Sequence, residues 1–427
     1  MNNKVLKRIM KDVKAEIITI GDEILYGQIV DTNAQWMSEE LSNTGIKTIR
    51  KTTVGDVRKD ILASFSEAEE RADIILITGG LGPTKDDLTK PLLAEYFNSP
   101  LVINEEALTE VKIFFERRGR ELTKLNRMQA ELPEVCTKIT NRMGTAPGMW
   151  FEKDDKVFVS MPGVPIEMKT IMLEEVIPKL HEVFNTPVIY HKMIKTIGIG
   201  ESFLSEIIEP WEDNLQGNIK LAYLPSAGQV KLRLTAMGGD HAKLVKDVDE
   251  QIEKLKPLAG KYIYGYDKTK LPAAIGQLLR ENNLTIATAE SCTGGFLAYQ
   301  IISVPGSSDY YIGSVLSYAD EVKMIELRVS KQSLEEHGAV SENVAVQMAE
   351  NVRKRLNASI GLSTTGIAGP DGGSEEKPVG IVWIGYSDEN RSFARKFQLT
   401  TDRLLNIQLT TNIALNILRV EMIKNNA

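Results

Sequence analysis

The strongest constraint on the fold of this chain is an alternation of short, continuously apolar runs with helical patterns, which begins at Ala15. In order, the pattern predicts a strand at 15–21, a helix that Asp31 or Thr32 caps and Gly45 ends, a strand from Ile46, a helix at 60–72 and a strand at 73–80. Runs that are apolar at successive positions are typical of strands covered on both faces, and the strand-helix-strand order favours parallel pairing. We therefore predict an α/β fold with a doubly wound sheet, whose ligands collect at the carboxyl ends of the strands.

The 427 residues divide into three predicted domains, in keeping with roughly 150 residues per domain. The first covers 15–180 and ends in the helix that follows MPGVPIEM. The second, 187–262, is a small α+β unit with a strand, a helix at 201–212, a strand pair around LPSAGQ and a helix at 241–255, and it runs into an edge-like KYIYGY at 261–266. It contains no dense cluster of titratable groups, so we expect it to pack or space its neighbours, and a binding domain is the alternative. The third, 268–427, is an α/β domain that opens with an amphipathic helix and the strand TIATAE, and ends in a helix at 401–423.

The composition and net charge of the chain limit the classes of binding partner and the cellular compartment that we expect. Lysine and arginine number 51 against 58 aspartate and glutamate residues, a net charge of −7, which disfavours non-specific binding to nucleic acid. The two cysteines, Cys136 and Cys292, have no CxxC partner, which fits a reducing cytoplasm. No apolar run approaches the roughly 18 to 20 residues that span a bilayer, and the basic segment 1–14 lacks the apolar core of a secretory signal. We expect a soluble, cytoplasmic protein with no membrane contact and a short basic tail, in which Met10 is an alternative start.

The segment TGGLGPTKDDLTKPLL at 78–93 is the most informative motif of the first domain. Its glycines follow a strand and precede a helix, where backbone N–H groups can hold a phosphate, and the predicted phosphate-binding residues are Gly79, Gly80, Gly82 and Thr84. Acidic residues stand beside this loop and at the end of the first strand, and carboxylates near phosphate suit a divalent metal such as Mg²⁺. The predicted metal ligands are Asp22, Glu23, Asp86 and Asp87. Helix capping is the alternative for Asp86 and Asp87.

Further polar turns carry a family resemblance. They are Asn33, Asn126, GTAPG at 144–148 and MPGVP at 161–165. Together with TGGLGPTKDD, GDEIL and NRMQA, they resemble the molybdopterin-cofactor-binding fold. In the amino-acid sequence of the motifs, they resemble the N-terminal domain of the CinA (competence-damage-inducible protein A) family. That resemblance implies hydrolysis of ADP-ribose to AMP and ribose 5-phosphate with a divalent metal (Mg, Mn or Co). A pterin-binding or vestigial module is the alternative.

The third domain repeats the arrangement of a glycine pair between a strand and a helix, in ATAESCTGGFLA at 287–298. Its N–H groups could bind a phosphate or an oxyanion. Other candidates are the segment 305–323 with Ser308, Tyr318 and Lys323, the polar glycine-rich loop at 364–380, and Arg403 at the start of the last helix. His337 is the one histidine of this domain and is expected to be structural, which leaves lysine as the base for a serine nucleophile. The alternative for Lys323 is a solvated helix residue.

The motifs AESCTGG, PGSS, SY-EVK, HGAVSE and TGIAGPDGGSEEKPVG resemble the C-terminal domain of the CinA family, a nicotinamide mononucleotide deamidase. The resemblance implies Ser308 as nucleophile, Lys323 as general base and Tyr318 as hydrogen-bonding partner, with no metal. It implies substrate-binding roles for Ser291, Thr293, Gly294, Gly366, Gly369 and Arg403. Cys292, beside a helix start that would stabilise a thiolate, is the competing nucleophile.

We therefore expect a bifunctional hydrolase of NAD salvage. It should deamidate nicotinamide mononucleotide to nicotinic acid mononucleotide and ammonia, and it should hydrolyse ADP-ribose. We expect it to be a homodimer. The rival hypothesis is a non-catalytic, molybdopterin-like binding or interaction protein that acts in competence or the DNA-damage response.

Overall fold

The computed structural model describes residues 13–84, 86–184 and 186–425. The predicted basic tail before residue 13 and the alternative start at Met10 lie outside these residues. The chain forms two compact units, Met1–Tyr190 with Met237–Leu244, and His191–Ala236 with Val245–Ala427. Each unit is described by itself. No helix of the described residues is long and apolar enough to cross a membrane.

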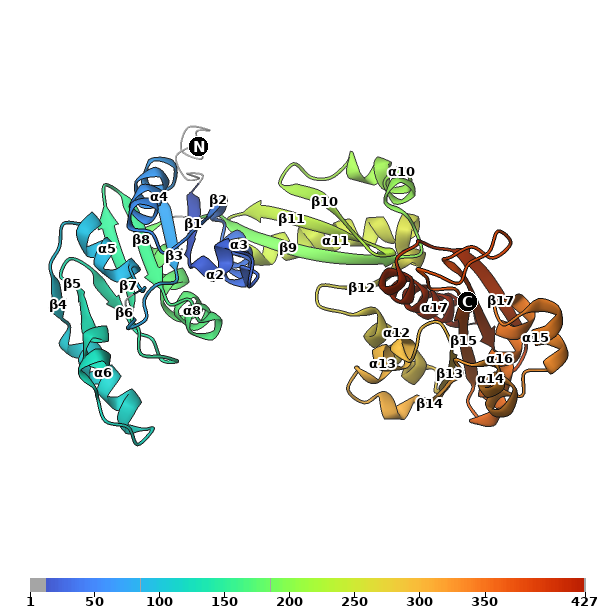
Figure 1. Cartoon of the computed structure of the whole chain (residues 1–427). Coiled ribbons are helices and arrows are strands. Elements are labelled where there is room, and N and C mark those ends of the chain that lie inside the picture. Colours follow the sequence, from blue (N-terminus) through green and yellow to red (C-terminus); the bar gives the residue numbers. More distant parts are fainter. Residues whose placement is uncertain (1–12, 85, 185, 426–427) are drawn as a thin grey trace. The chain divides into compact units, whose positions relative to one another are not determined.

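The first unit is built on a six-stranded sheet of order β2-β1-β3-β8-β7-β6 (Figure 1). The strands are β1 (Lys14–Ile20), β2 (Lys47–Val54), β3 (Ile74–Thr78), β6 (Thr137–Ile139), β7 (Gly148–Lys153) and β8 (Lys156–Met161). The four strands β2, β1, β3 and β8 pair in parallel, and β7 and β6 extend the sheet antiparallel. After its first residue β1 is buried at every position, as its apolar run predicted.

Helices cover both faces of this sheet, so the doubly wound prediction is confirmed. One apolar core lies under α3 (Thr32–Asn43), α8 (Pro165–Ile171), the π-helical turn η2 (Met172–Val176) and α9 (Ile177–Val183). The other lies under α4 (Arg58–Arg71), α5 (Thr89–Tyr96) and α6 (Glu105–Glu116). Asp31 caps α3 by accepting a hydrogen bond from the Ala34 N–H at 2.8 Å. The remaining elements are α2 (Asp22–Leu25), β4 (Leu101–Ile103), α7 (Lys124–Arg127), η1 (Met128–Ala130) and β5 (Glu131–Pro133).

The middle segment has one four-stranded sheet of order β10-β11-β9-β12. Its elements are β9 (Val188–Ile197), α10 (Glu201–Glu212), β10 (Ile219–Ser226), β11 (Gln229–Gly238), α11 (His241–Ala259), η3 (Gly260–Tyr262) and β12 (Ile263–Tyr266). Within the second unit it packs against the last helix of the chain. Arg419 donates hydrogen bonds to the carbonyls of Lys261 and Ile263, and Asn412 donates to that of Ala227.

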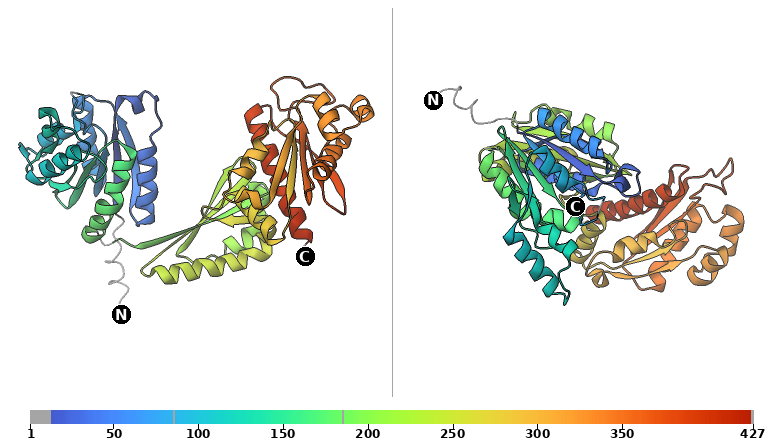
Figure 2. Two further views of the ribbon diagram at one scale, coloured as in Figure 1. Left: turned by 90° about the horizontal axis from the view of Figure 1, so that it is seen from below. Right: turned by 60° about the vertical axis from the view of Figure 1, so that its left-hand side comes forward.

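The last part of the chain forms a five-stranded sheet of order β14-β13-β15-β16-β17. The strands are β13 (Ile286–Glu290), β14 (Tyr311–Leu316), β15 (Ile360–Gly366), β16 (Ile381–Ser387) and β17 (Ser392–Gln398). The first three are parallel and the last two antiparallel. One face packs on α12 (Leu271–Glu281), α13 (Phe296–Ile302) and α17 (Arg403–Asn425), the other on α14 (Asp320–Leu327) and α16 (Glu342–Arg355) (Figure 2). The short elements are η4 (Ser307–Asp309) and α15 (Lys331–His337).

Candidate active sites

The first candidate site is a cavity of about 480 Å³ at the carboxyl ends of β1, β3 and β8. Parallel strands gather their following loops at one edge, so the turns singled out in the sequence meet there. The wall includes Gly79, Gly80 and Gly82, the acidic residues Glu23, Asp86 and Asp87, and the turns around Thr145 and Gly163. Asn126 and Thr84 do not line it. The predicted position at the strand ends is therefore observed.

The glycine loop is shaped by close packing. A Cβ on Gly79 would lie 2.1 Å from the Ile20 carbonyl oxygen, and one on Gly80 would lie 2.2 Å from the Thr89 hydroxyl. Both glycines also have positive φ angles. The N–H of Gly79 already donates to Met161, and those of Gly82 and Thr84 donate to the Asp87 carboxylate at 2.8 and 2.9 Å. Contrary to the prediction, these three N–H groups are not free for a phosphate, because the chain's own oxygens satisfy them.

The four predicted metal ligands do not converge. The Asp87 carboxylate accepts hydrogen bonds from the glycine loop, as described above. Asp22 lies outside the cavity wall. It forms two hydrogen bonds with Asp56, in each of which the carboxylate of one residue accepts from the N–H of the other. Burial, together with the charges of Asp22, Glu23 and Asp86, raises the pKa of Asp56. Among the described residues no group of three or more His, Cys, Asp and Glu side chains is placed to hold a metal ion. Glu23 lines the cavity, and its carboxylate makes no hydrogen bond to another described residue.

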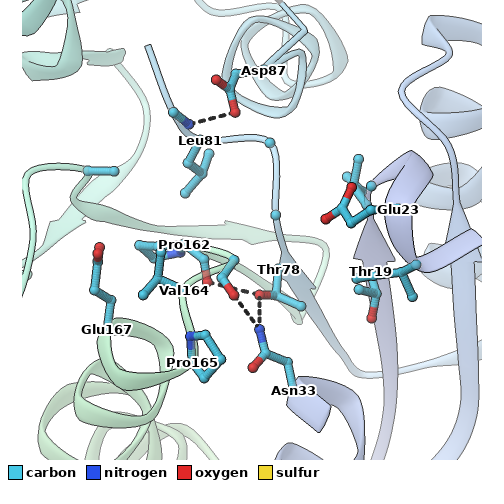
Figure 3. Close-up of a pocket in the computed structure, with 18 of the residues that line it drawn as sticks. Thr19, Glu23, Asn33, Thr78, Leu81, Asp87, Pro162, Val164, Pro165 and Glu167 are labelled. Atoms are coloured by element: carbon cyan, nitrogen blue, oxygen red, sulfur yellow. Dashed lines mark hydrogen bonds between the residues drawn. The ribbon is translucent and has the colours of Figure 1, made fainter. Parts of the chain in front are cut away.

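A hydrogen-bonded floor links the strands below the cavity (Figure 3). Thr78 donates to the Pro162 carbonyl at 2.9 Å, and Asn33 donates to the Gly163 carbonyl at 2.7 Å. The Oδ1 atom of Asn33 is buried without a partner among the described residues. Asp56 and Glu167 also line the cavity, and the sequence pattern, which indicated Asn33 and the MPGVP turn, did not single them out. Single acidic residues in polar turns carry no signal that distinguishes them from surface residues.

The second candidate site is a pocket of about 180 Å³ at the carboxyl ends of β13, β14 and β15. It is lined by Ser291, Cys292, Tyr318, Asp320, Lys323, Ala339, Val340, Thr365, Gly366, Ala368 and Arg403. Five of the residues predicted from the sequence therefore meet here: Ser291, Tyr318, Lys323, Gly366 and Arg403. Thr293, Gly294, Gly369 and His337 do not line the pocket.

Lys323 is 1% exposed, so the alternative of a solvated helix residue is wrong. Its Nζ atom donates to the Tyr318 carbonyl at 3.0 Å and to the Asp320 carboxylate at 3.3 Å. Arg403, the first residue of α17, donates to the Gly369 carbonyl at 2.8 Å and contacts the Tyr318 hydroxyl at 3.5 Å. The guanidinium of Arg403 on the pocket wall favours an anionic ligand there.

The AESCTGG loop is not the open anion site that its glycines predicted. Glu290, fully buried at the end of β13, accepts hydrogen bonds from the Thr293 hydroxyl and from the N–H groups of Gly295, Leu297 and Ala298. The start of α13 is therefore filled by a carboxylate of the chain itself. The role of Thr293 is to bind Glu290 and Thr364 rather than to face the pocket. Glu290 stands at the end of the predicted strand TIATAE, but nothing in the local pattern distinguishes it as the partner of these N–H groups.

Ser308, the nucleophile implied by the resemblance, lies at the opposite end of the sheet from Lys323. It belongs to η4, before β14, whereas Tyr318 and Lys323 follow that strand. The Tyr310 carbonyl accepts from Ile286 at the start of β13, while the Ser317 N–H donates to Glu290 at its end. A strand of this length spans about 20 Å at roughly 3.3 Å per residue. The described chain therefore does not bring Ser308 and Lys323 together.

Two nucleophilic side chains do line the pocket. Ser291 is 8% exposed, and its hydroxyl makes no hydrogen bond to another described residue. Cys292 is buried, and burial, with the charge of Glu290 adding to it, raises the pKa of its thiol to about 12. A thiol with so high a pKa carries almost no thiolate near neutral pH, which disfavours Cys292 as nucleophile.

Comparison with known proteins places these sites in a family. Residues 16–182 match the model of a probable molybdopterin binding domain, residues 191–265 that of the damage-inducible protein CinA KH domain, and residues 268–422 that of the CinA C-terminal domain. A CinA-like protein of Cytophaga hutchinsonii is 50% identical over 410 residues, which cover 96% of this chain and 98% of the relative. Another, of Flavobacterium psychrophilum, is 44% identical and covers 97% and 99%.

Solved structures of the same superfamily also match. A competence-damaged protein (CinA) superfamily protein of Escherichia coli is 34% identical, with a TM-score of 0.35, and covers 35% of this chain and 88% of that one. The high identity to whole relatives, along nearly the full length of both chains, shows that the chain belongs to the CinA family.

Proposed function

We propose that the C-terminal pocket hydrolyses the carboxamide of nicotinamide mononucleotide. The observation that carries this proposal is the buried amine of Lys323 in the same small pocket as the uncommitted hydroxyl of Ser291. A serine needs a neighbouring base to become a nucleophile, and a lysine amine can serve when it is unprotonated. The family resemblance supplies the substrate class, and the cationic Arg403 supports an anionic substrate.

In the proposed reaction the Ser291 oxygen attacks the carboxamide carbon, and its proton passes to the Lys323 amine. The carbon–nitrogen bond then breaks as Lys323 returns that proton to the leaving nitrogen, which departs as ammonia. Water hydrolyses the resulting acyl ester, so that nicotinic acid mononucleotide is released and the serine is restored. Ser291 replaces Ser308 in this role because it is the serine that lines the pocket.

Ammonia release from nicotinamide mononucleotide tests this function. Ser291→Ala should lose at least about a thousandfold in kcat/KM, the scale seen when a nucleophile and base act as a unit. Ser303→Ala, at the exposed residue that follows α13, is the matched control and should be as active as the unmodified chain. Absence of ammonia from the unmodified protein would refute the deamidase, and a fully active Ser291→Ala would refute the nucleophile.

We propose a second activity for the N-terminal cavity, the hydrolysis of ADP-ribose to AMP and ribose 5-phosphate. The observation that favours it is a 480 Å³ cavity, within the range of nucleotide-sized ligands, with Glu23 and Asp86 on its wall. Water would add to one phosphorus of the pyrophosphate as the bridging oxygen leaves with the other product. Glu23, whose carboxylate is uncommitted, is suited to accept the proton of that water.

The residues present fit a divalent cation that shares its coordination with the substrate. Mg²⁺ is usually held by one or two carboxylates together with waters and substrate phosphates, and Asp86 would supply the carboxylate here, which leaves Glu23 as the base. A bound cation would neutralise the charge of the pyrophosphate. Asp22 and Asp87 are less suited, because their carboxylates accept hydrogen bonds from the chain.

AMP formation from ADP-ribose tests this second activity. EDTA should stop it, and Glu23→Gln should reduce it at least a hundredfold, while Glu39→Gln on the exposed side of α3 should not. Neither change should alter ammonia release. If the chain forms neither ammonia nor AMP, the rival hypothesis of a non-catalytic binding protein is favoured instead.

A further inference from the structure

Three exposed apolar side chains belong to the wall of the N-terminal cavity, and we call them the apolar lip. They are Ile29, which is 52% exposed, Val30 at 78% and Val164 at 49%. Exposed apolar side chains that are gathered in one place and bordered by polar residues mark a surface that a ligand or another molecule covers. Because these three line a cavity, the molecule that fills the cavity covers them.

Hydrogen bonds fix the two segments that form the apolar lip. The Ile29 N–H donates to the Glu23 carbonyl at 3.2 Å, which folds this segment back onto α2. The side-chain amide of Asn33, at the start of α3, donates to the carbonyl of Gly163 at 2.7 Å, and Gly163 directly precedes Val164. The two segments are therefore held at the same side of the cavity, and a ligand bound there does not have to order them.

The remainder of the cavity wall is polar. Figure 3 shows Asp87 across the cavity from Asn33, at the glycine loop 79–82. Asp86 also belongs to this part of the wall, and it is the carboxylate proposed above for a cation that binds phosphate. Among the wall residues that the structure describes there is no lysine, arginine or histidine. The wall thus has one apolar and one acidic side.

ADP-ribose has the same division into parts. Its sugars and its pyrophosphate are polar or charged, whereas its adenine has two flat faces without charge. Proteins hold such bases between aromatic or apolar side chains. Burial of apolar against apolar surface favours the adenine on the apolar lip, and the pyrophosphate then lies toward the acidic side, where a cation can neutralise it.

We propose that the apolar lip binds the purine base of the substrate through contacts with the faces of the base. This inference rests on the proposed hydrolysis of ADP-ribose. The side chains of Ile29, Val30 and Val164 have no hydrogen-bonding group, so they do not distinguish one purine edge from another. The substrate class is then ribose joined to a purine nucleoside diphosphate, with adenine as one of the accepted bases.

Binding of the two products by the full chain, measured by titration calorimetry with Mg²⁺ present, tests the base site. Val30→Ser and Val164→Ser should each weaken the binding of AMP at least about tenfold, the scale of a missing apolar group in a binding pocket. Neither change should alter the binding of ribose 5-phosphate, which has no base. Val57→Ser is the matched control, because this valine is 51% exposed and does not line the cavity, and it should bind AMP as the unmodified chain does.

A second measurement tests whether the edge of the base is read. IMP has an oxygen where AMP has its amino group, and the faces of the two bases are alike. The unmodified chain should therefore bind AMP and IMP with Kd values within about threefold of each other, because a site that hydrogen-bonds a ligand group rejects the analogue without it far more strongly. A larger preference for AMP would show that hydrogen bonds select the base, and it would overturn the proposal.

The base site and the proposed activity can fail separately. If AMP binding depends on Val30 and Val164 but the chain does not hydrolyse ADP-ribose, the activity is refuted and the base site stands. If the chain hydrolyses ADP-ribose but both serine variants bind AMP as the unmodified chain does, the base site is refuted and the activity stands. An unmodified chain that does not bind AMP would also overturn the base site.

Discussion

Glu290 should be the residue whose loss most disturbs the C-terminal pocket, although it does not line it. Its carboxylate is fully buried and accepts five hydrogen bonds, three from N–H groups at the start of α13 and two from the hydroxyls of Thr293 and Ser314. In Glu290→Gln one oxygen becomes an NH₂ group. If the remaining oxygen keeps the position nearest Thr293, Gly295 and Leu297, the NH₂ group faces the Ala298 N–H, which was 2.8 Å from the lost oxygen.

The expected cost follows from these contacts. A hydrogen bond to a charged group contributes about 1.5 to 3 kcal/mol, and a buried N–H left without a partner costs a similar amount. The loss of charge also weakens the bonds that remain. We expect the helix start to be less stable by about 3 kcal/mol, which is roughly a hundredfold at 1.4 kcal/mol per factor of ten.

Amide hydrogen exchange measures this effect where it occurs. The N–H groups of Gly295, Leu297 and Ala298 should exchange about a hundredfold faster in Glu290→Gln, and deamidase kcat should fall because Ser291 lies on the same loop. Glu281→Gln, an exposed change at the end of α12, is the control and should alter neither. Exchange within threefold of the unmodified chain would refute the assignment of Glu290 as the support of this loop.

Further predictions concern the chemistry. Lys323→Ala should lose at least about a thousandfold in kcat/KM for ammonia release, because it removes the proposed base of the serine nucleophile. Cys292→Ala should retain most of the deamidase activity. Burial raises the pKa of the Cys292 thiol, so alkylation of this thiol in the unmodified chain should be slow at pH 8 and accelerate only at strongly alkaline pH, as mass spectrometry would show. Asp87→Asn should slow AMP formation less than Glu23→Gln, because it loosens the glycine loop without removing an uncommitted carboxylate.

The sequence determined the elements and their order, because apolar periodicity and capping are local. The helix α10 has the predicted bounds of Glu201–Glu212, and the Asp31 cap begins α3 where it was expected. The sequence also determined which polar loops gather at the two sites, because parallel strands place all of their carboxyl ends at one edge. The family motifs were likewise present in the sequence alone.

Tertiary structure decided which of these residues are available for chemistry. Asp87 and Glu290 were visible as acidic residues beside glycine loops, yet only the fold shows that their carboxylates satisfy the N–H groups assigned to a ligand. Ser308 and Lys323 are close in sequence, but an intervening strand carries them to opposite ends of the sheet. Burial of Lys323 and the free hydroxyl of Ser291 likewise depend on residues distant in the chain. Hydrogen-bond satisfaction and burial are properties of the packed molecule, which local sequence patterns do not encode.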